Sequence, residues 1–350
     1  MARYSSTRGQ VKNLLFEEAV MMGLADDGGL LVPNEIPHVR NKLPEWRSFS
    51  FTELSLEIML LFTSNRIPRK ELKPLIEQSY NTFRHPEITP VKSVEGLHIL
   101  ELFHGPTFAF KDVALQFLGN LFEYFLNRRQ HPLRILGATS GDTGSAAIHG
   151  LHGKKGVDVF MLHPKGRVSP MQERQMTTVL DPNIHNLAIE GTFDDAQAIV
   201  KRLFNDQDFK KNYYLGSVNS INWARILAQI VYYFYAWFQV SKDDSELVSF
   251  VVPTGNFGNV LAGYYAKRMG LPIDKLVIGT NENDILHRFF SKGEYHRTEL
   301  KETFSPSMDI QISSNFERYL FDLAGNSTEQ LQRWMKDFER SGKLTIEGDL

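Results

Sequence analysis

One lysine stands in an aromatic setting in the stretch "HGPTFAFKD", residues 104–112. Phe108 and Phe110 precede Lys111, and Asp112 begins the helix that is predicted behind it. A neutral lysine amine near pH 7.4 costs about 4 kcal/mol, because the reference pKa is roughly 10.4, and apolar surroundings reduce that cost. Lys111 is therefore a candidate nucleophile, provided that the fold keeps water away from it.

Two glycine-rich loops follow apolar runs that are typical of strands. "RILGA" leads into residues 139–145 and "FVVP" leads into residues 254–259, and a helix is predicted after each loop. Backbone N–H groups and the positive end of a helix dipole then meet at the carboxyl edge of a sheet, where anions bind. Neither loop has the glycine spacing of a dinucleotide site or a P-loop. We expect two anion sites, with ordinary strand-to-helix turns as the alternative.

The lysine and the two loops together suit one cofactor. An activated amine attacks an aldehyde, and the aldehyde cofactor with a phosphate handle is pyridoxal phosphate (PLP). One loop could bind the cofactor phosphate and the other a substrate anion. The alternative is a helix-entry lysine that lies over phenylalanines, because the following helix has apolar residues at core-face spacing, namely Ala114, Phe117, Leu118, Leu121 and Phe125.

Composition excludes several classes of protein. With 350 residues, 42% hydrophobic and 23% charged, the chain is predicted to be globular. A net charge of −2 offers no basic face for nucleic acid, and the absence of cysteine excludes disulfides and thiolate metal sites. The longest apolar run, residues 228–240, is shorter than the ~20 residues of a membrane span, so we expect a buried helix. No membrane or nucleic-acid partner is predicted, and the cytoplasm is the default location.

Secondary-structure signals change along the chain. Residues 12–90 have helix caps and turns, which indicates a mainly helical N-terminal region. From about residue 97, short β-type runs alternate with glycine turns and amphipathic helices. This alternation predicts βαβ units and a mostly parallel sheet.

At this point the sequence resembles the threonine synthases of fungi and many bacteria. The opening "RYSSTRG" and "DDGGLLVP" resemble that family's start, so we expect no cleavable leader. The resemblance extends in order over nearly the whole chain. Its specific segments are "ELFHGPTFAFKDVALQFLGNLFEYFL", "GATSGDTGSAAI", "PKGRVSPMQERQMTT", "NSINWARILAQ", "VVPTGNFGNVLAGYYAKRMGLP" and "SPSMDIQISSNFER".

The resemblance implies an α/β fold of the tryptophan-synthase-β-like type, fold type II of the PLP-dependent enzymes. The cofactor would lie between a larger and a smaller α/β domain. We expect an N-terminal, mainly helical region over residues 1–90 and a catalytic region over residues 91–350. The small domain, about residues 131–214, would be inserted in the large one.

The resemblance also implies roles for individual residues. Lys111 matches the lysine that forms the internal aldimine with PLP. The loop that holds the cofactor phosphate matches Gly255, Asn256, Phe257 and Gly258, with Asn259 as a weaker member. In the loop at 139–145, Asp142 would approach the cofactor's 3-hydroxyl, and the substrate carboxylate would bind at Ser140, Gly141 and Thr143.

The implied reaction converts O-phospho-L-homoserine and water to L-threonine and phosphate. Expelling phosphate requires positive charge and hydrogen-bond donors at the leaving group. Asn222 and Arg225 are three residues apart, so on a helix they would share one face and could bind a phosphate together. An ion pair of Arg225 with an acid on a neighbouring helix is the structural alternative.

Several further polar residues have structural interpretations. Lys165 and Arg167 are a second pair of basic residues that could bind the leaving phosphate, but they are expected on a solvated turn. His104 is expected to form a hydrogen bond within the fold. Ser314 and Glu317 have the spacing of a capping box. His149 and His152 lie three apart, but no third ligand is evident, so no metal site is predicted.

Members of the family usually continue well past the point where this chain stops. Because the chain stops earlier than they do, the resemblance implies a fragment or truncated product. In the family, the missing segment carries a small hydroxyl residue near the pyridine nitrogen. Three interpretations stay open: a threonine synthase, a catabolic phospho-lyase of the same fold that releases 2-oxobutyrate, and a non-catalytic binding protein. Dehydratases and cysteine synthases of the same fold type would not need a second phosphate site.

Overall fold

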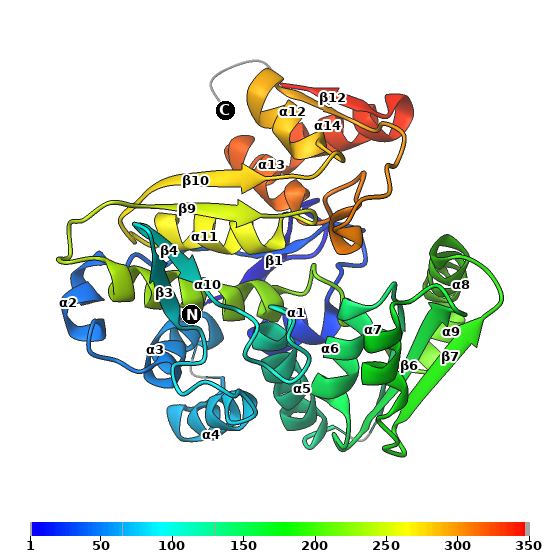
Figure 1. Ribbon diagram of the computed structural model, residues 1–350. Coiled ribbons are helices and arrows are strands. Elements are labelled where there is room, and N and C mark those ends of the chain that lie inside the picture. The colour runs from blue at the N-terminus through cyan, green and yellow to red at the C-terminus, as the bar shows by residue number, and fades with distance from the viewer. Residues whose placement is uncertain (1, 65, 130, 347–350) are drawn as a thin grey trace. The chain divides into compact units, whose positions relative to one another are not determined.

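The computed structural model describes residues 2–64, 66–129 and 131–346, and Figure 1 labels their helices and strands. The chain forms two compact units, each of which is described by itself. Unit 1 comprises Met1–Ala19, Leu24–Arg47 and Ser220–Leu350, and unit 2 comprises Val20–Gly23 and Ser48–Asn219. The first helix, α1 (Phe16–Met22), has residues in both units.

Unit 2 contains a four-stranded parallel sheet in the order β7-β6-β5-β8. Its strands are β5 (Leu133–Ala138), β6 (Val157–Pro164), β7 (Ile184–Ile189) and β8 (Leu215–Gly216). The helices that connect them are α6 (Asp142–Leu151), α7 (Pro170–Thr177), α8 (Phe193–Asn205) and α9 (Gln207–Asn212). Parallel strands need such crossovers, and this agrees with the βαβ units predicted from the sequence.

The sheet of unit 2 buries apolar side chains beneath α8. Leu136 of β5, Leu162 of β6 and Ala196 of α8 form the buried centre of this cluster, and Val200 and Leu203 pack against it. The helix begins at a capping box in which Thr192 and Asp195 exchange hydrogen bonds, and this satisfies N–H groups that the helix leaves free.

Three further helices and a hairpin complete unit 2. The helices are α3 (Phe51–Thr63), α4 (Arg69–Tyr80) and α5 (Asp112–Leu126), and the hairpin pairs β3 (Val91–Val94) with β4 (Leu97–Leu100). Helix α5 begins at Asp112, as the sequence predicts, and is buried on nearly every side. A helix that is apolar all round is stable only inside a core, where it packs here against α4 and α6.

Helices α5 and α6 run side by side in the same direction (Figure 1). A Cβ built on Gly119 of α5 would lie 1.9 Å from the carbonyl oxygen of Gly150 in α6, so only glycine fits there. Eight residues before each glycine, Lys111 and Asp142 are also in contact. Eight residues span about 12 Å of helix. The glycine contact thus sets the register that brings the two N-terminal ends together.

Unit 1 is built from short sheets and helices. Along the chain, the buried helix α10 (Trp223–Val240) comes first. It is followed by the strands β9 (Val248–Pro253) and β10 (Ile273–Gly279), which pair in parallel. The other helices of unit 1 are α2 (Leu43–Trp46), α11 (Gly258–Arg268), α12 (Ile285–Lys292), α13 (Phe316–Leu323) and α14 (Thr328–Ser341), with 3-10 turns η1 (Arg40–Lys42) and η2 (Pro306–Met308). Antiparallel pairs join β1 (Tyr4–Ser6) to β2 (Leu31–Pro33) and β11 (Glu294–His296) to β12 (Lys343–Thr345).

The apolar run at residues 228–240 lies within α10, and this confirms that it forms a buried helix. Across residues 2–64, 66–129 and 131–346, no helix is both long and apolar enough to cross a membrane. The predicted capping box of Ser314 with Glu317 is wrong. Asn315 is the N-cap of α13, and Glu317 accepts hydrogen bonds from Thr7 and Arg8 instead.

Replacing Gly119 by alanine tests the contact between α5 and α6. Alanine favours a helix by about 1 kcal/mol over glycine, so helix propensity alone predicts stabilisation. The collision with the Gly150 carbonyl should outweigh it, and we expect a net loss of about 1–3 kcal/mol. The readout is the urea midpoint followed by circular dichroism. Gly279→Ala is the control, because its Cβ would have no neighbour closer than 3.5 Å. A Gly119→Ala midpoint at or above that of the wild type would refute the contact.

Candidate functional site

Lys111 occupies the N-cap position of α5 and points toward α6. Its Nζ donates a hydrogen bond to Oδ2 of Asp142 at 2.5 Å and lies 4.9 Å from the centre of the Phe110 ring. The Lys111 side chain is only 12% exposed. Phe108, by contrast, is 60% exposed, and its ring stacks with the guanidinium group of Arg84. Of the two predicted aromatic neighbours, the structure places Phe110 against the amine.

The loop before Lys111 is held by the side chains of Asp112 and Arg84. The Asp112 carboxylate accepts hydrogen bonds from the N–H and the hydroxyl group of Thr107, at 2.8 and 2.7 Å. Burial raises the pKa of Asp112, and these two donors oppose the shift. Arg84 donates to the carbonyl oxygens of Gly105 and Pro106. The position of the lysine backbone therefore depends on Asp112 and Arg84, and the sequence analysis assigned a role to neither.

The glycine loop of unit 2 follows β5 and opens α6, as predicted. The Thr139 hydroxyl oxygen accepts hydrogen bonds from the N–H groups of Gly141 and Gly144, at 3.0 and 2.9 Å. Gly141 has φ +148°, and a Cβ there would lie 2.0 Å from Oε1 of Gln172. Glycine is therefore required at this position for both conformation and space.

The predicted substrate residues lie on this loop, next to Asp142. Within the described part of the chain, the backbone N–H groups of Ser140, Asp142 and Thr143 donate no hydrogen bond. They stand at the N-terminal end of α6, where the helix dipole favours an anion. The arrangement is chemically suited to a carboxylate beside the lysine amine.

The glycine loop of unit 1 follows β9 and opens α11, again as predicted. Phe257 has φ +62°, a left-handed conformation that is strained for a bulky residue. A left-handed residue directly before a helix is typical of the backbone nests whose N–H groups bind anions. No hydrogen bond from the N–H groups of residues 255–258 to another described residue is present. This loop can therefore hold a phosphate.

Asn259 differs from its neighbours in this loop. Its Oδ1 accepts hydrogen bonds from the hydroxyl groups of Tyr232 and Tyr233, at 2.5 and 3.0 Å. Burial raises the pKa of both tyrosines, so they remain protonated donors. The Oδ1 of Asn259 thus joins α11 to α10, and its carbonyl oxygen also accepts from the hydroxyl of Tyr233 at 3.0 Å.

The loop of unit 1 rests on residues 313–315, which sequence analysis treated as structural. The Ser313 hydroxyl donates to the carbonyl oxygen of Gly255 at 2.6 Å, and the Ser314 hydroxyl donates to Oδ1 of Asn256 at 3.1 Å. Asn315 donates from its backbone and side chain to the carbonyl oxygen of Asn256. The "SSN" in "SPSMDIQISSNFER" was the signal that could have identified this support.

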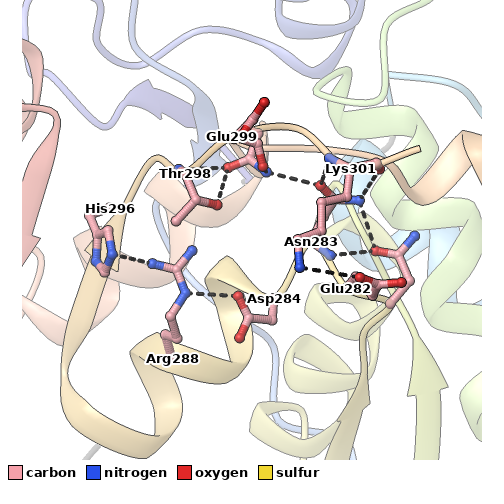
Figure 2. Close-up of polar contacts among 10 residues, drawn as sticks. Glu282, Asn283, Asp284, Arg288, His296, Thr298, Glu299 and Lys301 are labelled. Carbon is pink, nitrogen blue, oxygen red and sulfur yellow. Dashed lines mark hydrogen bonds and ion pairs between the residues drawn. The ribbon is translucent and has the colours of Figure 1, made fainter. Parts of the chain in front are cut away.

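Side-chain amides organise the segment that leads to this support (Figure 2). Asn283 accepts from the N–H of Lys301 at 3.0 Å and donates to the carbonyl oxygen of Lys301 at 2.8 Å. Arg288 bridges Asp284 and His296 beside it. Further along, a Cβ on Gly255 would lie 2.9 Å from Cδ1 of Ile310. These polar contacts hold together a segment with little regular secondary structure, and Ile310 further along the chain packs beside Gly255.

Asn222 and Arg225 lie at the start of α10 and are buried, with 1% and 2% exposure. Asn222 is the N-cap rather than a residue of the helix, because its Oδ1 accepts from the N–H of Ala224. Asn222 therefore stands at the cap and Arg225 in the first turn, three residues apart. Both stand at a helix N-terminus, where a phosphate is favoured.

The remaining candidates take part in structural contacts. The exposed Lys165 pairs with Glu190, and His104 contacts Glu101 at 2.8 Å. Nε2 of His149 lies 3.0 Å from the carbonyl oxygen of Gln175, and burial lowers the pKa of His149. The described residues contain no group of three or more metal-ligating side chains.

The predicted site residues are divided between the two units. Lys111 and the loop that contains Ser140, Gly141, Asp142 and Thr143 belong to unit 2. The loop at 255–259, together with Asn222 and Arg225, belongs to unit 1. Within unit 1, the hydroxyl of Ser220 contacts that of Ser314, so the turn before α10 meets the support of the loop.

Comparisons with known proteins agree with this geometry. The chain matches the family "Threonine synthase N terminus" over residues 3–80 and "Pyridoxal-phosphate dependent enzyme" over residues 83–348. A threonine synthase of Schizosaccharomyces pombe is 55% identical, over 98% of this chain and 73% of the relative.

Solved structures give the same result. PLP-bound threonine synthase from Brucella melitensis superposes with a TM-score of 0.96 at 46% identity, over 100% of this chain and 75% of the other. Threonine synthase from yeast gives 0.94 at 51% identity, over 99% and 73%. The fold is therefore fold type II of the PLP-dependent enzymes, as predicted, and the chain belongs to the threonine synthase family of PLP-dependent lyases.

Proposed function

We propose that this chain converts O-phospho-L-homoserine and water to L-threonine and phosphate. The observation that carries the proposal is Lys111, a nearly buried amine at the N-terminal ends of two helices, within hydrogen-bond distance of a glycine loop. Threonine synthases at 46–55% identity support the same reaction. The cytoplasm is the proposed location.

The residues present fit PLP. Lys111 supplies the amine that binds its aldehyde, and the nest at 255–258 has N–H groups suited to its phosphate. Asn259 is proposed as a weaker member of this set, because two tyrosine hydroxyls already bind its Oδ1. When bound, PLP withdraws electrons from the substrate Cα and so stabilises a carbanion there.

Lys111 is proposed to move the protons of the reaction. Its freed Nζ would take the proton from the substrate Cα and then help to transfer the proton at Cβ. Asp142, 2.5 Å from Nζ, orients the amine and is the residue assigned to the cofactor's 3-hydroxyl. The low exposure of the Lys111 side chain limits access of water to this amine.

Two groups of residues are proposed to hold the substrate's anions. The loop of Ser140, Gly141 and Thr143 would bind the carboxylate at the start of α6, through the N–H groups of Ser140 and Thr143, while Gly141 provides the turn. Asn222 and Arg225 would bind the phosphate that leaves. A guanidinium group in a buried position stabilises the charge that develops there more strongly than it would in water.

We also propose a division into an N-terminal region, residues 1–90, and a catalytic region, residues 91–350, with a small domain at about 131–214. The change from one matched family to the other between residues 80 and 83 supports the first boundary. The four-stranded sheet from β5 to β8 supports the small domain.

Lys111→Ala should abolish the cofactor's lysine-dependent absorbance band and all turnover, because it removes the amine that is proposed to bind the aldehyde. The matched control is Lys154→Ala. Lys154 has a similarly shielded side chain, 16% exposed, but donates to Asn120 and pairs with Glu123. Spectra with added PLP and an assay of released phosphate are the measurements. A band that survives in folded Lys111→Ala would exclude Lys111 as the cofactor lysine.

Arg225→Ala should leave the absorbance band intact and lower kcat by about a hundredfold or more. The substitution removes the positive charge that is proposed to stabilise the leaving phosphate, and it leaves the cofactor site unchanged. Arg167→Ala, on an exposed turn, is the control and should retain full activity. Unchanged kinetics with O-phospho-L-homoserine in Arg225→Ala would contradict the assignment. Chromatography of the product separates L-threonine from 2-oxobutyrate, which a phospho-lyase would release.

A further inference from the structure

Arg318 of α13 is a buried arginine whose hydrogen-bond acceptors are all neutral oxygens. It is 1% exposed. Its Nε and Nη2 donate to the carbonyl oxygen of Leu31 at 3.1 and 2.9 Å, and Nη2 also donates to that of Ile221 at 2.5 Å. Its Nη1 donates to Oδ1 of Asn315 at 2.5 Å. None of these acceptors carries a negative charge.

The burial of this positive charge is energetically unfavourable unless something compensates it. Removing a cation from water costs several kcal/mol unless an anion compensates it. Burial lowers the pKa of Arg318 to about 10, so the guanidinium stays charged at neutral pH. The charge of the adjacent acid, Glu317, opposes this lowering of the Arg318 pKa, but Glu317 accepts from Thr7 and forms an ion pair with Arg8 rather than with Arg318. Arg318 thus has no carboxylate among its hydrogen-bond partners, and an anion that binds in unit 1 would add compensating charge.

Asn315 connects Arg318 to the loop at 255–258. While its Oδ1 accepts from Arg318, its backbone N–H and Nδ2 donate to the carbonyl oxygen of Asn256, at 3.1 and 3.3 Å. A Cβ on Gly258 would lie 3.2 Å from the same Nδ2. Arg318 therefore orients the amide that braces the centre of the loop.

The other contacts of Arg318 lead to the start of α10. Ile221, whose carbonyl oxygen it binds, immediately precedes Asn222, and Nδ2 of Asn315 also donates to the carbonyl oxygen of Ser220. The guanidinium lies 5.9 Å from the centre of the Trp223 ring. One buried side chain thus holds both the cofactor-phosphate loop and the turn that carries Asn222.

We propose that Arg318 is a positioning residue that sets the separation of these two phosphate-binding elements and provides a buried counter-charge for the phosphate at residues 255–258. This inference rests on the proposed function. It predicts that Arg318 contributes to the binding of the cofactor's phosphate group and not to the binding of its aldehyde ring at Lys111.

The test compares the binding of PLP with that of pyridoxal, which has the same aldehyde and no phosphate. Absorbance titration of the full chain yields both dissociation constants. In Arg318→Met, the preference for PLP over pyridoxal should fall by about ten- to a hundredfold, as expected for the loss of charged hydrogen bonds. Pyridoxal affinity should remain unchanged. Arg318→Lys keeps the charge but not the planar fork, so its preference should be intermediate.

Arg47→Met is the matched control. Arg47 also lies in unit 1 and donates to a backbone carbonyl oxygen, that of Ser241, but it forms an ion pair with Asp244 and none of its contacts is with the loop. Its preference for PLP should equal that of the wild type. A thermal melt of each variant verifies folding, and Arg318→Lys decides the question if Arg318→Met does not fold.

A parallel loss of PLP and pyridoxal affinity in the Arg318 variants would mean a general structural role and would overturn the inference. An unchanged preference would overturn it as well. If wild-type chain binds PLP without any dependence on Lys111, or does not bind it, the proposed function itself fails. Titrations of the wild-type chain and of Lys111→Ala therefore separate the two failures.

Discussion

The contact between Gly119 and Gly150 is the constraint on which unit 2 depends. Two helix backbones approach so closely there that a single methyl group would collide with a carbonyl oxygen. Because the contact lies eight residues from Lys111 on one helix and eight from Asp142 on the other, it aligns the N-terminal ends of both helices. Helix dipoles at this end disfavour a cation and favour an anion. The carboxylate of Asp142 is therefore needed beside the amine, and the substrate's carboxylate finds a favourable field.

In unit 1, the loop at residues 255–258 is arranged for an anion by its backbone conformation and by the side chains that support it. A phosphate carries close to two negative charges, so it needs several N–H groups that point the same way and a positive field behind them. The left-handed Phe257 provides the first, at a cost in backbone strain that the surrounding structure must offset. Ser313, Ser314 and Asn315 hold the carbonyl groups and the side chain of the loop from behind, which leaves the N–H groups toward the ligand.

In cofactor enzymes generally, the cofactor and the protein contribute different parts of the reaction. The cofactor supplies the chemistry of the carbanion, while the protein places one amine, two anion sites and the groups that hold them. Preorganised donors act strongly because they need not reorient when charge develops. This requirement explains why many of the contacts described above join a side chain to a backbone carbonyl: Arg84, Arg318, Ser313 and Asn315 all orient the chain rather than contact the ligand.

The sequence by itself determined the two strand–loop–helix units, the start of α5 directly after Lys111, and the buried α10. These features are local, since each depends on apolar periodicity, glycine turns and caps within a few residues. The motifs also identified the family.

Contacts between residues far apart in the chain could not be predicted from such local patterns. Ser314 and Glu317 match a capping box in spacing, yet each has partners far away in the chain, at Asn256, Ser220, Thr7 and Arg8. Likewise, the spacing of Asn222 and Arg225 did not reveal that Asn222 caps α10. The contact of Lys111 with Asp142, the register of α5 on α6 and the burial of Arg318 were decided by the tertiary structure alone, because packing and desolvation depend on which distant segments meet, and one chain's residue spacing does not encode that.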